Sequence, residues 1–308
     1  MGELKTYKTP AGFKAALADR LRARAKTQRV PPDPTRAVAV MERFLARVVA
    51  VFPETTLLKG GLALELRLEQ ARTTKDIDLR LLGEPDSAMA LMERAALYRV
   101  VPDDYLTFRA VIDPEHPKIH GDGVVYDGSR FRVTAFLASE QYGPPFGVDV
   151  SFADAVHGDP VELIGGDAFA FIGVPPVKVR VYPTGSHIAE KLHAYTFPRR
   201  PGEENTRVKD LPELALIAKI DGLTATEILA AIKATFTFRN THAVPPVVPE
   251  PPASWAEKYR KIADDDGLPW RELGSVYAAV RAFVDPVLAG NAGIWDANGW
   301  TWRTSETG

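Results

Sequence analysis

Cysteine is absent from the 308-residue sequence. Its absence excludes disulfide bonds, thiolate nucleophiles and cysteine-ligated zinc sites together. Long apolar runs are absent as well, since no stretch approaches the roughly 20 apolar residues that cross a bilayer. The first residues, MGELKTYKTPAGFK, lack the apolar core of a signal peptide. We therefore expect a cytoplasmic protein.

An excess of charge of one sign is also missing. The sequence has 38 Lys and Arg residues against 40 Asp and Glu residues, which does not indicate nucleic-acid binding by the chain as a whole. The segment 14–29 is a local exception, with a single acid, Asp19. Its basic residues are Lys14, Arg20, Arg22, Arg24, Lys26 and Arg29. Two interpretations stay open, a solvated helix face or an electrostatic track for a phosphate backbone.

Hydrophobic and charged fractions of 45% and 25% are those of an ordinary globular protein. Periodicity predicts helices at 11–29, 34–51, 62–68, 85–97, 186–197, 209–220, 224–236, 255–264 and 271–288. It predicts strands at 55–58, 76–82, 105–112, 131–137, 147–152, 169–172 and 177–181. The fold class is thus α/β (α+β), a mixed sheet with flanking helices in 1–184 and a helical half packed against it in 185–308.

The most informative stretch is 57–81, LLKGGLALELRLEQARTTKDIDLRL. A short apolar run ends at Lys59-Gly60-Gly61, and a helical pattern resumes directly after it. Glycines permit positive φ and close backbone approach, while the free amides of a helix N-terminus attract an anion. We predict a phosphate-binding turn to which Lys59 adds charge, with an ordinary structural turn as the alternative. No Walker or dinucleotide-binding glycine motif occurs in the sequence.

Two carboxylates follow at short range, Asp76 and Asp78, inside an apolar run. At positions i and i+2 of a strand, both side chains leave the same face. Their mutual repulsion favours a cation between them, and Mg²⁺ prefers such oxygen ligands. The alternative is a solvated strand face with Arg72, Lys75 and Arg80 as ion-pair partners.

A third acid, Asp149, lies within the apolar segment Val148-Asp149-Val150. A charge in that position is costly unless it is paired or bound to a metal. Together with Asp76 and Asp78 it would complete a metal site for in-line phosphoryl transfer. Pairing of Asp149 with a nearby arginine is the alternative.

These residues resemble a known family. Lys59-Gly60-Gly61 with Ala63-Leu64, followed by Arg72-x-Thr74-x-Asp76-Ile77-Asp78-Leu79, is similar to the first motif of the AbiEii/AbiGii toxin nucleotidyltransferases. Those proteins belong to the polymerase-β-like nucleotidyltransferase superfamily. Two later segments agree, His187-Ile188-Ala189-Glu190-Lys191-Leu192-His193-Ala194 and Arg207-Val208-Lys209-Asp210-Leu211. The resemblance covers about residues 38–220.

The resemblance implies a role for each matching residue. Lys59, Gly60, Gly61, Lys191 and Arg207 would bind the nucleotide phosphates. The catalytic residues would be Asp76, Asp78, Asp149, Lys191 and Asp210, and the metal ligands would be Asp76, Asp78 and Asp149. Two departures are present, because Gly61 stands where the superfamily often has Ser, and Glu213 stands where a second Asp is often found.

Outside the resemblance, the helical residues have simpler explanations. Lys191 on its own fits a surface lysine, and also a flexible point charge for phosphate at the edge of a cleft. Asp210 shares a predicted helix face with Leu214 and Ile217, so we expect it near the packed side. It also fits a first-turn carboxylate or an ion-pair partner of Arg207.

The sequence therefore predicts a Mg²⁺-dependent nucleotidyltransferase, with Mn²⁺ as an alternative ion. It would transfer a nucleoside monophosphate from a nucleoside triphosphate to an acceptor hydroxyl. The resemblance implies the toxin of a toxin–antitoxin pair, with an antitoxin partner and a tRNA 3′ end as acceptor. The alternatives are a transferase that modifies proteins or small molecules, a nucleotide-binding regulator without activity, and a metal nuclease.

Overall fold

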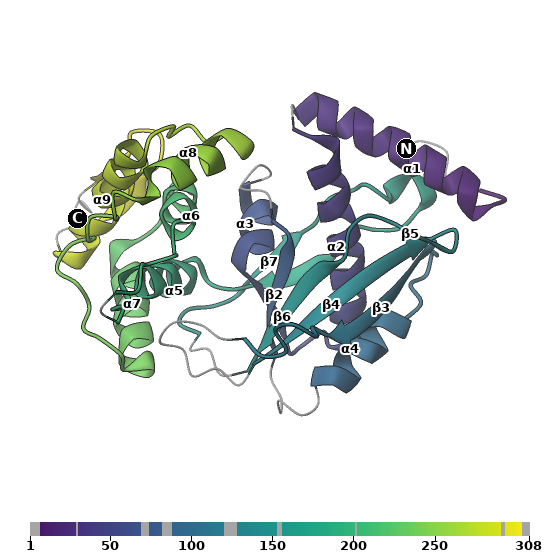
Figure 1. Cartoon of the computed structure of the whole chain (residues 1–308), viewed down its shortest axis with the longest axis horizontal. Helices are drawn as coiled ribbons and strands as arrows, with labels where there is room; N and C mark the ends of the chain where they lie inside the picture. Colours follow the sequence, from purple (N-terminus) through teal and green to yellow (C-terminus); the bar gives the residue numbers. More distant parts are fainter. Residues whose placement is uncertain are drawn as a thin grey trace, which may run out of the picture.

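A mixed α/β half is followed by a helical half along the chain (Figure 1). The computed structural model describes residues 7–28, 30–68, 74–81, 88–119, 128–152, 156–200, 202–290 and 293–303. Within these ranges no helix is long and apolar enough to cross a membrane. The fold class expected from the sequence is confirmed, because a mixed sheet with flanking helices precedes the helical half.

The bounds of the elements are as follows. The helices are α1 (Pro10–Gln28), α2 (Pro32–Val51), α3 (Gly60–Leu68), α4 (Ala88–Leu97), α5 (Thr184–Thr196), α6 (Asp210–Ile217), α7 (Ala225–Arg239), α8 (Trp255–Asp265) and α9 (Leu273–Leu288). The strands are β1 (Thr56–Lys59), β2 (Asp76–Leu81), β3 (Leu106–Ile112), β4 (Gly128–Leu137), β5 (Glu140–Gln141), β6 (Phe146–Ser151), β7 (Val161–Ile164), β8 (Lys178–Val181), β9 (Ile294–Asp296) and β10 (Thr301–Arg303).

One large sheet organises the first half. Its strand order is β3-β4-β6-β2-β1-β8-β7, and the short strand β5 pairs with β4. The pairs β2–β6 and β1–β8 are parallel, whereas β1–β2, β3–β4, β4–β6 and β7–β8 are antiparallel. This order places β2 beside β6, although 64 residues (82–145) lie between the two strands in the sequence.

Alternation along β2 decides which side chains reach solvent. Ile77 and Leu79 are fully buried in the core that α2 and α4 share with the sheet. Asp76 and Asp78, which alternate with these two residues along the strand, point to the opposite face because successive side chains on a strand alternate. Val148 and Val150 on β6 are buried in the same way, which leaves Asp149 on the face of the aspartates.

The apolar residues form two clusters. The first contains buried residues from Phe13 to Val181, and the second contains residues from Ile188 to Trp295 together with Leu64. Helix α3 contributes to both, since Leu62 belongs to the first cluster and Leu64 to the second. In Figure 1, α3 accordingly lies between the sheet and the green-to-yellow helices. The domain boundary at 184/185 stays a prediction.

Several sequence-based expectations differ from the structure. The segment expected as a strand at 169–172 contains a 3₁₀ turn, Ala170–Ile172, which ends at Gly173 in the left-handed conformation. A short apolar run such as this one does not distinguish a strand from a helical turn. Helix α2 begins at Pro32, two residues before the expected start at 34, and Asp33 lies in its first turn. Strands β5, β7, β9 and β10 were not expected.

The tryptophans near the C-terminus pack in the core of the helical half. Trp255 and Trp295 are each 1% exposed. Trp295 donates a hydrogen bond from Nε1 to the carbonyl of Ala218 at 2.6 Å. Trp302 stacks on Phe283 with ring centroids 5.6 Å apart. The proline-rich segment 244–252 is an irregular connector, as its composition predicts.

The turn between β1 and α3 generates a first prediction. Gly60 has a φ of +68°, and a Cβ on it would lie 1.8 Å from Oδ2 of Asp78. Gly60→Ala therefore adds a steric clash to the cost of a left-handed backbone, and we expect it to lower the free energy of unfolding by about 3 kcal/mol. Chemical denaturation followed by circular dichroism measures this change.

Gly222→Ala is the matched control. Gly222 has a φ of +75° and no atom within 4 Å of its added Cβ, so only the backbone cost of about 1 kcal/mol applies. Equal destabilisation by the two substitutions would contradict the close approach of Asp78 to the turn.

Candidate active site

The site begins where β1 meets α3. Lys59 ends β1, and the register of the antiparallel β1–β2 pair sets it opposite Asp78. Gly60 turns the chain with a positive φ and leaves no room for a side chain beside the Asp78 carboxylate. The amides that open α3 and the carboxylate of Asp78 are therefore immediate neighbours. A left-handed glycine is required here for a physical reason, as expected from the sequence.

The three strand carboxylates lie on one face of the sheet. Asp78 on β2 is the register partner of Asp149 on the parallel strand β6. Asp76 is the partner of Gly147, and a Cβ at Gly147 would lie 2.4 Å from Oδ1 of Asp76. Gly147 thus accommodates the Asp76 carboxylate over β6. The structure brings together the three acids that the sequence singled out.

The surroundings of Asp78 perturb its ionisation. Partial burial raises its pKa to about 6, and the negative charges of Asp149 and Asp76 contribute in the same direction. Lys59 and Lys191 oppose this shift without cancelling it. Lys59 belongs to the sheet half and Lys191 to α5 of the helical half, so cationic side chains from both halves act on Asp78. The remaining negative charge at Asp78 favours a bound cation.

Asp149 is held by an arginine from the neighbouring strand. Arg130 on β4 lies opposite Asp149, and its Nε and Nη2 each donate a hydrogen bond of 2.7 Å to one carboxylate oxygen. The Asp149 side chain is 12% exposed and that of Arg130 is 38% exposed. In this conformation, Asp149 has the arginine partner that the simpler interpretation of the sequence proposed.

The donor set suits a hard divalent cation. Asp76, Asp78 and Asp149 offer only carboxylate oxygens, the ligands that Mg²⁺ prefers. The raised pKa of Asp78 identifies negative charge that such an ion would neutralise. Across the part of the chain that the structure describes, no three His, Asp or Glu side chains converge closely enough to hold a metal. The residues fit the ion chemically, but Asp149 is turned toward Arg130.

A buried ionic cluster lies on the helical side of the site. Lys191 on α5 forms ion pairs with Asp210, at 3.4 Å, and with Glu213, both on α6. Arg207 binds Asp210 from its other side, with Nε 2.7 Å from Oδ2. The side chains of Asp210 and Glu213 are each 3% exposed, and that of Lys191 is 17% exposed. Burial alone would lower the pKa of Lys191, but Glu213 and Asp210 outweigh burial and raise it.

Glu213, which stands where the family often has a second Asp, was not among the predicted site residues, but the structure places it against Lys191. Its contact with Lys191 shows that the longer acid at this position reaches the lysine. The Asp210 pairing with Arg207 that the sequence left open is present, but Asp210 also contacts Lys191. Neither simple explanation of Asp210 is therefore sufficient.

Glu190 links Lys59 to the helical half. Its carboxylate lies 3.7 Å from Nζ of Lys59 and 3.5 Å from the guanidinium of Arg239 on α7. It also accepts a hydrogen bond of 3.1 Å from the hydroxyl of Tyr182. Sequence reasoning missed Glu190, although its position beside Lys191 in the α5 motif was a usable signal.

His187 lies one turn before Lys191 on α5 and is 3% exposed. Burial lowers its pKa to about 3, and the charge of Lys191 acts in the same direction. His187 is therefore neutral at physiological pH, and Lys191 has no competing cation on its own helix face.

Helix α1 does not offer a free row of cations. Three of its basic residues pair with acids and Arg20 lies over the ring of Phe171, 4.1 Å from the centroid. The ion pairs are Lys14–Glu140, Arg22–Asp19 and Arg24–Asp167. This arrangement favours the solvated, paired helix face over a phosphate track. Arg29 and, in the first motif, Arg72 lie outside the described residues.

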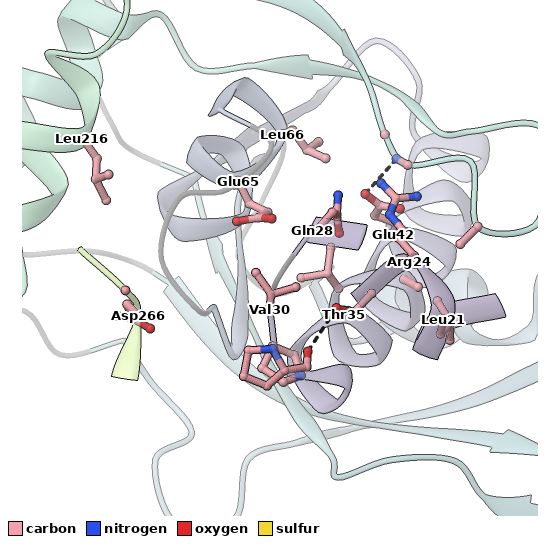
Figure 2. Close-up of a pocket in the computed structure, with 18 of the residues that line it drawn as sticks. Leu21, Arg24, Gln28, Val30, Thr35, Glu42, Glu65, Leu66, Leu216 and Asp266 are labelled. Atoms are coloured by element: carbon pink, nitrogen blue, oxygen red, sulfur yellow. Dashed lines mark hydrogen bonds between the residues drawn. The ribbon is translucent and has the colours of Figure 1, made fainter. Parts of the chain in front are cut away.

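A cavity of about 820 Å³ lies apart from these residues, between α1 and α2 on one side and α6 and the end of α8 on the other. Figure 2 shows Glu42 and Arg24 on one wall and Leu216 and Asp266 across from them. Glu65 and Leu66 of α3 also line this cavity. None of the candidate site residues lines it, so we do not assign the chemistry to this cavity.

The geometry can now be compared with known proteins. A family model described as the nucleotidyl transferase AbiEii toxin of type IV toxin–antitoxin systems matches residues 43–277. The matched segment includes both carboxylate strands and the lysine-bearing helix α5. The chain belongs to the AbiEii toxin family. It is therefore a nucleotidyltransferase, and the resemblance stated from its motifs is confirmed.

No curated protein matches this AbiEii-family chain. Among solved structures, the nucleotidyltransferase toxin MenT4 from Mycobacterium tuberculosis H37Rv is similar over 90% of this chain and 98% of its own, with 14% identity and a TM-score of 0.48. JHP933 from Helicobacter pylori is similar over 82% of this chain and 93% of its own, with 14% identity and a TM-score of 0.46. These similarities are too weak to add to the family assignment.

The pKa of Asp78 generates a stability prediction for this AbiEii-family protein. Because the folded-state pKa of about 6 exceeds the ordinary value of 3.8, ionisation of Asp78 destabilises the fold, and this cost grows as pH rises from about 4 to 6. Asp78→Asn removes the charge. With a chelator present to remove divalent cations, we expect this substitution to raise the free energy of unfolding by about 2 kcal/mol at pH 7.5.

The gain should shrink as pH falls from about 6 to 4 and disappear by about pH 3, below both pKa values, where the wild-type carboxyl is protonated in the folded and the unfolded state. Urea denaturation across this pH range measures it. Destabilisation by Asp78→Asn at pH 7.5 would contradict an uncompensated charge at Asp78.

The cluster around Lys191 generates another prediction. Lys191→Met leaves Asp210 and Glu213 buried with one cation fewer, so we expect a loss of about 3 kcal/mol in the free energy of unfolding. Lys191→Arg keeps the charge and should lose less. Lys233→Met, at an exposed position on α7, is the control and should stay within about 0.5 kcal/mol of wild type. If Lys191→Met had the same free energy of unfolding as wild type, the cluster would not be held together by its charges.

Proposed function

We propose that this protein transfers a nucleoside monophosphate from a nucleoside triphosphate to an acceptor hydroxyl and releases pyrophosphate. The observation that carries the proposal is the position of Asp78. Its carboxylate lies against the Gly60 turn and beside Asp149 on the neighbouring strand, and the positive charges of Lys59 and Lys191 act on it. A phosphate-binding turn, adjacent carboxylates and cations from two sides meet at one point. Phosphoryl transfer requires these three kinds of group together.

Each residue has a distinct task in this proposal. The amides at Gly60 and Gly61 and the side chains of Lys59, Lys191 and Arg207 bind the triphosphate. Arg207 is 39% exposed while it pairs with Asp210, so part of its guanidinium can reach a ligand. Asp210 orients Lys191 and Arg207 at once, since it contacts both.

The carboxylates hold the metal and the acceptor. Asp76, Asp78 and Asp149 would bind Mg²⁺ or Mn²⁺, which when bound neutralises charge on the phosphates. Asp149 accepts the proton of the attacking hydroxyl at one carboxylate oxygen. The acceptor oxygen forms a phosphodiester bond to the α-phosphorus, the bond from that phosphorus to the oxygen bridging to the β-phosphate breaks, and pyrophosphate leaves with the electron pair.

The acceptor in the proposal is RNA, and specifically a tRNA 3′ end, so that the activity inhibits translation and growth. This choice is supported by membership of a toxin family. The same membership supports an antitoxin that restrains the activity. A reaction on tRNA with nucleoside triphosphates as donors belongs in the cytoplasm.

Labelling decides between acceptor classes. The protein is incubated with each α-³²P-labelled nucleoside triphosphate, Mg²⁺ and total RNA, and the products are separated on a denaturing gel. We expect label in small RNA, and a loss of at least about 100-fold in Asp76→Ala because a metal ligand is removed. Glu115→Gln, an exposed acid on the loop after β3, should label as wild type does.

Other outcomes identify the alternatives. Label in protein or in a small molecule would replace the RNA acceptor. Shortened RNA without label would indicate a metal nuclease. Binding of nucleotide without any product would indicate an inactive regulator, and equal labelling by Asp76→Ala would contradict the proposed metal site.

A further inference from the structure

Arg130 is the side chain in most direct competition with a cation at this site. Its guanidinium binds both oxygens of Asp149 at 2.7 Å, a bidentate geometry that covers the edge of the carboxylate. Arg130 donates these hydrogen bonds to Asp149, and the negative charges of Asp76 and Asp78 also act on its guanidinium. Arg130 therefore interacts electrostatically with all three carboxylates that are proposed as metal ligands.

The position of Arg130 is fixed by the sheet. Strand β4 pairs with β6 so that Arg130 is directly opposite Asp149, and β6 pairs with β2 so that Asp149 is opposite Asp78. The three side chains form a row across three adjacent strands. Asp149, the middle residue of that row, has Arg130 on one side and Asp78 on the other. It cannot give the same two oxygens in full both to Arg130 and to a cation that it would share with Asp78.

We propose that Arg130 is an internal counter-ion that a divalent cation must displace from Asp149. The inference rests on the proposed function, which makes Asp149 a metal ligand. Without a cation, Arg130 compensates the charge of Asp149 by donating to both of its carboxylate oxygens, while Asp78 on the next strand lies beyond this pair. A cation can bind to Asp149 only if the Arg130–Asp149 ion pair breaks. The free energy needed to break this pair lowers the affinity of the carboxylates for the cation.

Displacement also releases a cation for the substrate. The Arg130 side chain is 38% exposed and stays beside the carboxylates when Asp149 turns away. A phosphate that arrives at the site offers it a new bidentate partner. Cation and phosphate should therefore bind with positive coupling, and coupling between two ligands is reciprocal. The Arg130–Asp149 ion pair thus makes binding of the cation depend on binding of the substrate.

Mn²⁺ binding tests the proposal without catalysis. The free ion is measured by electron paramagnetic resonance during titration of the full chain, with no nucleotide present. We expect Arg130→Met to bind Mn²⁺ about three- to tenfold more tightly than wild type, the range for an ion pair of partial exposure. Arg130→Lys keeps a charge but loses the bidentate geometry, and it should fall between the two.

Arg132→Met is the matched control. Arg132 lies on the same strand, its side chain has the same exposure of 38%, and it pairs with Asp113 and not with Asp149. Its Mn²⁺ affinity should equal that of wild type. Thermal unfolding establishes that each variant is folded, and Arg130→Lys carries the test if Arg130→Met does not fold.

The remaining outcomes separate this inference from the proposed function. In an Asp149→Asn background, Arg130→Met should no longer change the affinity. Unchanged or weaker Mn²⁺ binding by Arg130→Met, with weaker binding by Asp149→Asn, would overturn the counter-ion role and leave the metal site intact. Mn²⁺ binding unaffected by both Asp78→Asn and Asp149→Asn would overturn the metal site itself.

Discussion

The charge balance around Asp78 is the constraint on which the site depends. Strand alternation buries Ile77 and Leu79 and thereby obliges Asp76 and Asp78 to share the opposite face. The parallel pairing of β2 with β6 then adds Asp149 to the same face. Lys59, Lys191 and Arg130 surround these acids, yet the pKa of Asp78 remains raised to about 6. The fold therefore concentrates negative charge where a metal and a triphosphate would meet, at the expense of stability.

The helical half contributes cations that it must itself hold in place. The charge of Lys191 acts on Asp78, while Asp210 and Glu213 stabilise that charge in a buried position. Glu190 holds Lys59 from the adjacent position on α5 and is in turn bound by Arg239. Two neighbouring residues of α5 thus act on the site in different ways, since Glu190 binds Lys59 and the charge of Lys191 acts on Asp78. The relative position of the two halves is in this way coupled to the charge at Asp78.

Much of the fold and most of the site could be predicted from local patterns. Alternation around Asp76-Ile77-Asp78, the isolated acid Asp149 and the glycine turn all identified residues that the structure brings together. The partners could not be predicted, because the contact of Arg130 with Asp149 is set by strand order and not by spacing. Strand β7 was missed for a local reason, since Val161 and Ile164 are exposed on an edge strand and show no regular alternation.

The ionisation of Asp78 tests the central claim most directly. In ¹³C NMR of the carboxyl group without divalent cations, this account predicts a pKa of about 6, from burial and from the charge of Asp149. Addition of Mg²⁺ should lower that value, because a bound cation stabilises the ionised form. An ordinary pKa near 4 in the absence of metal, unchanged by Mg²⁺, would contradict the account.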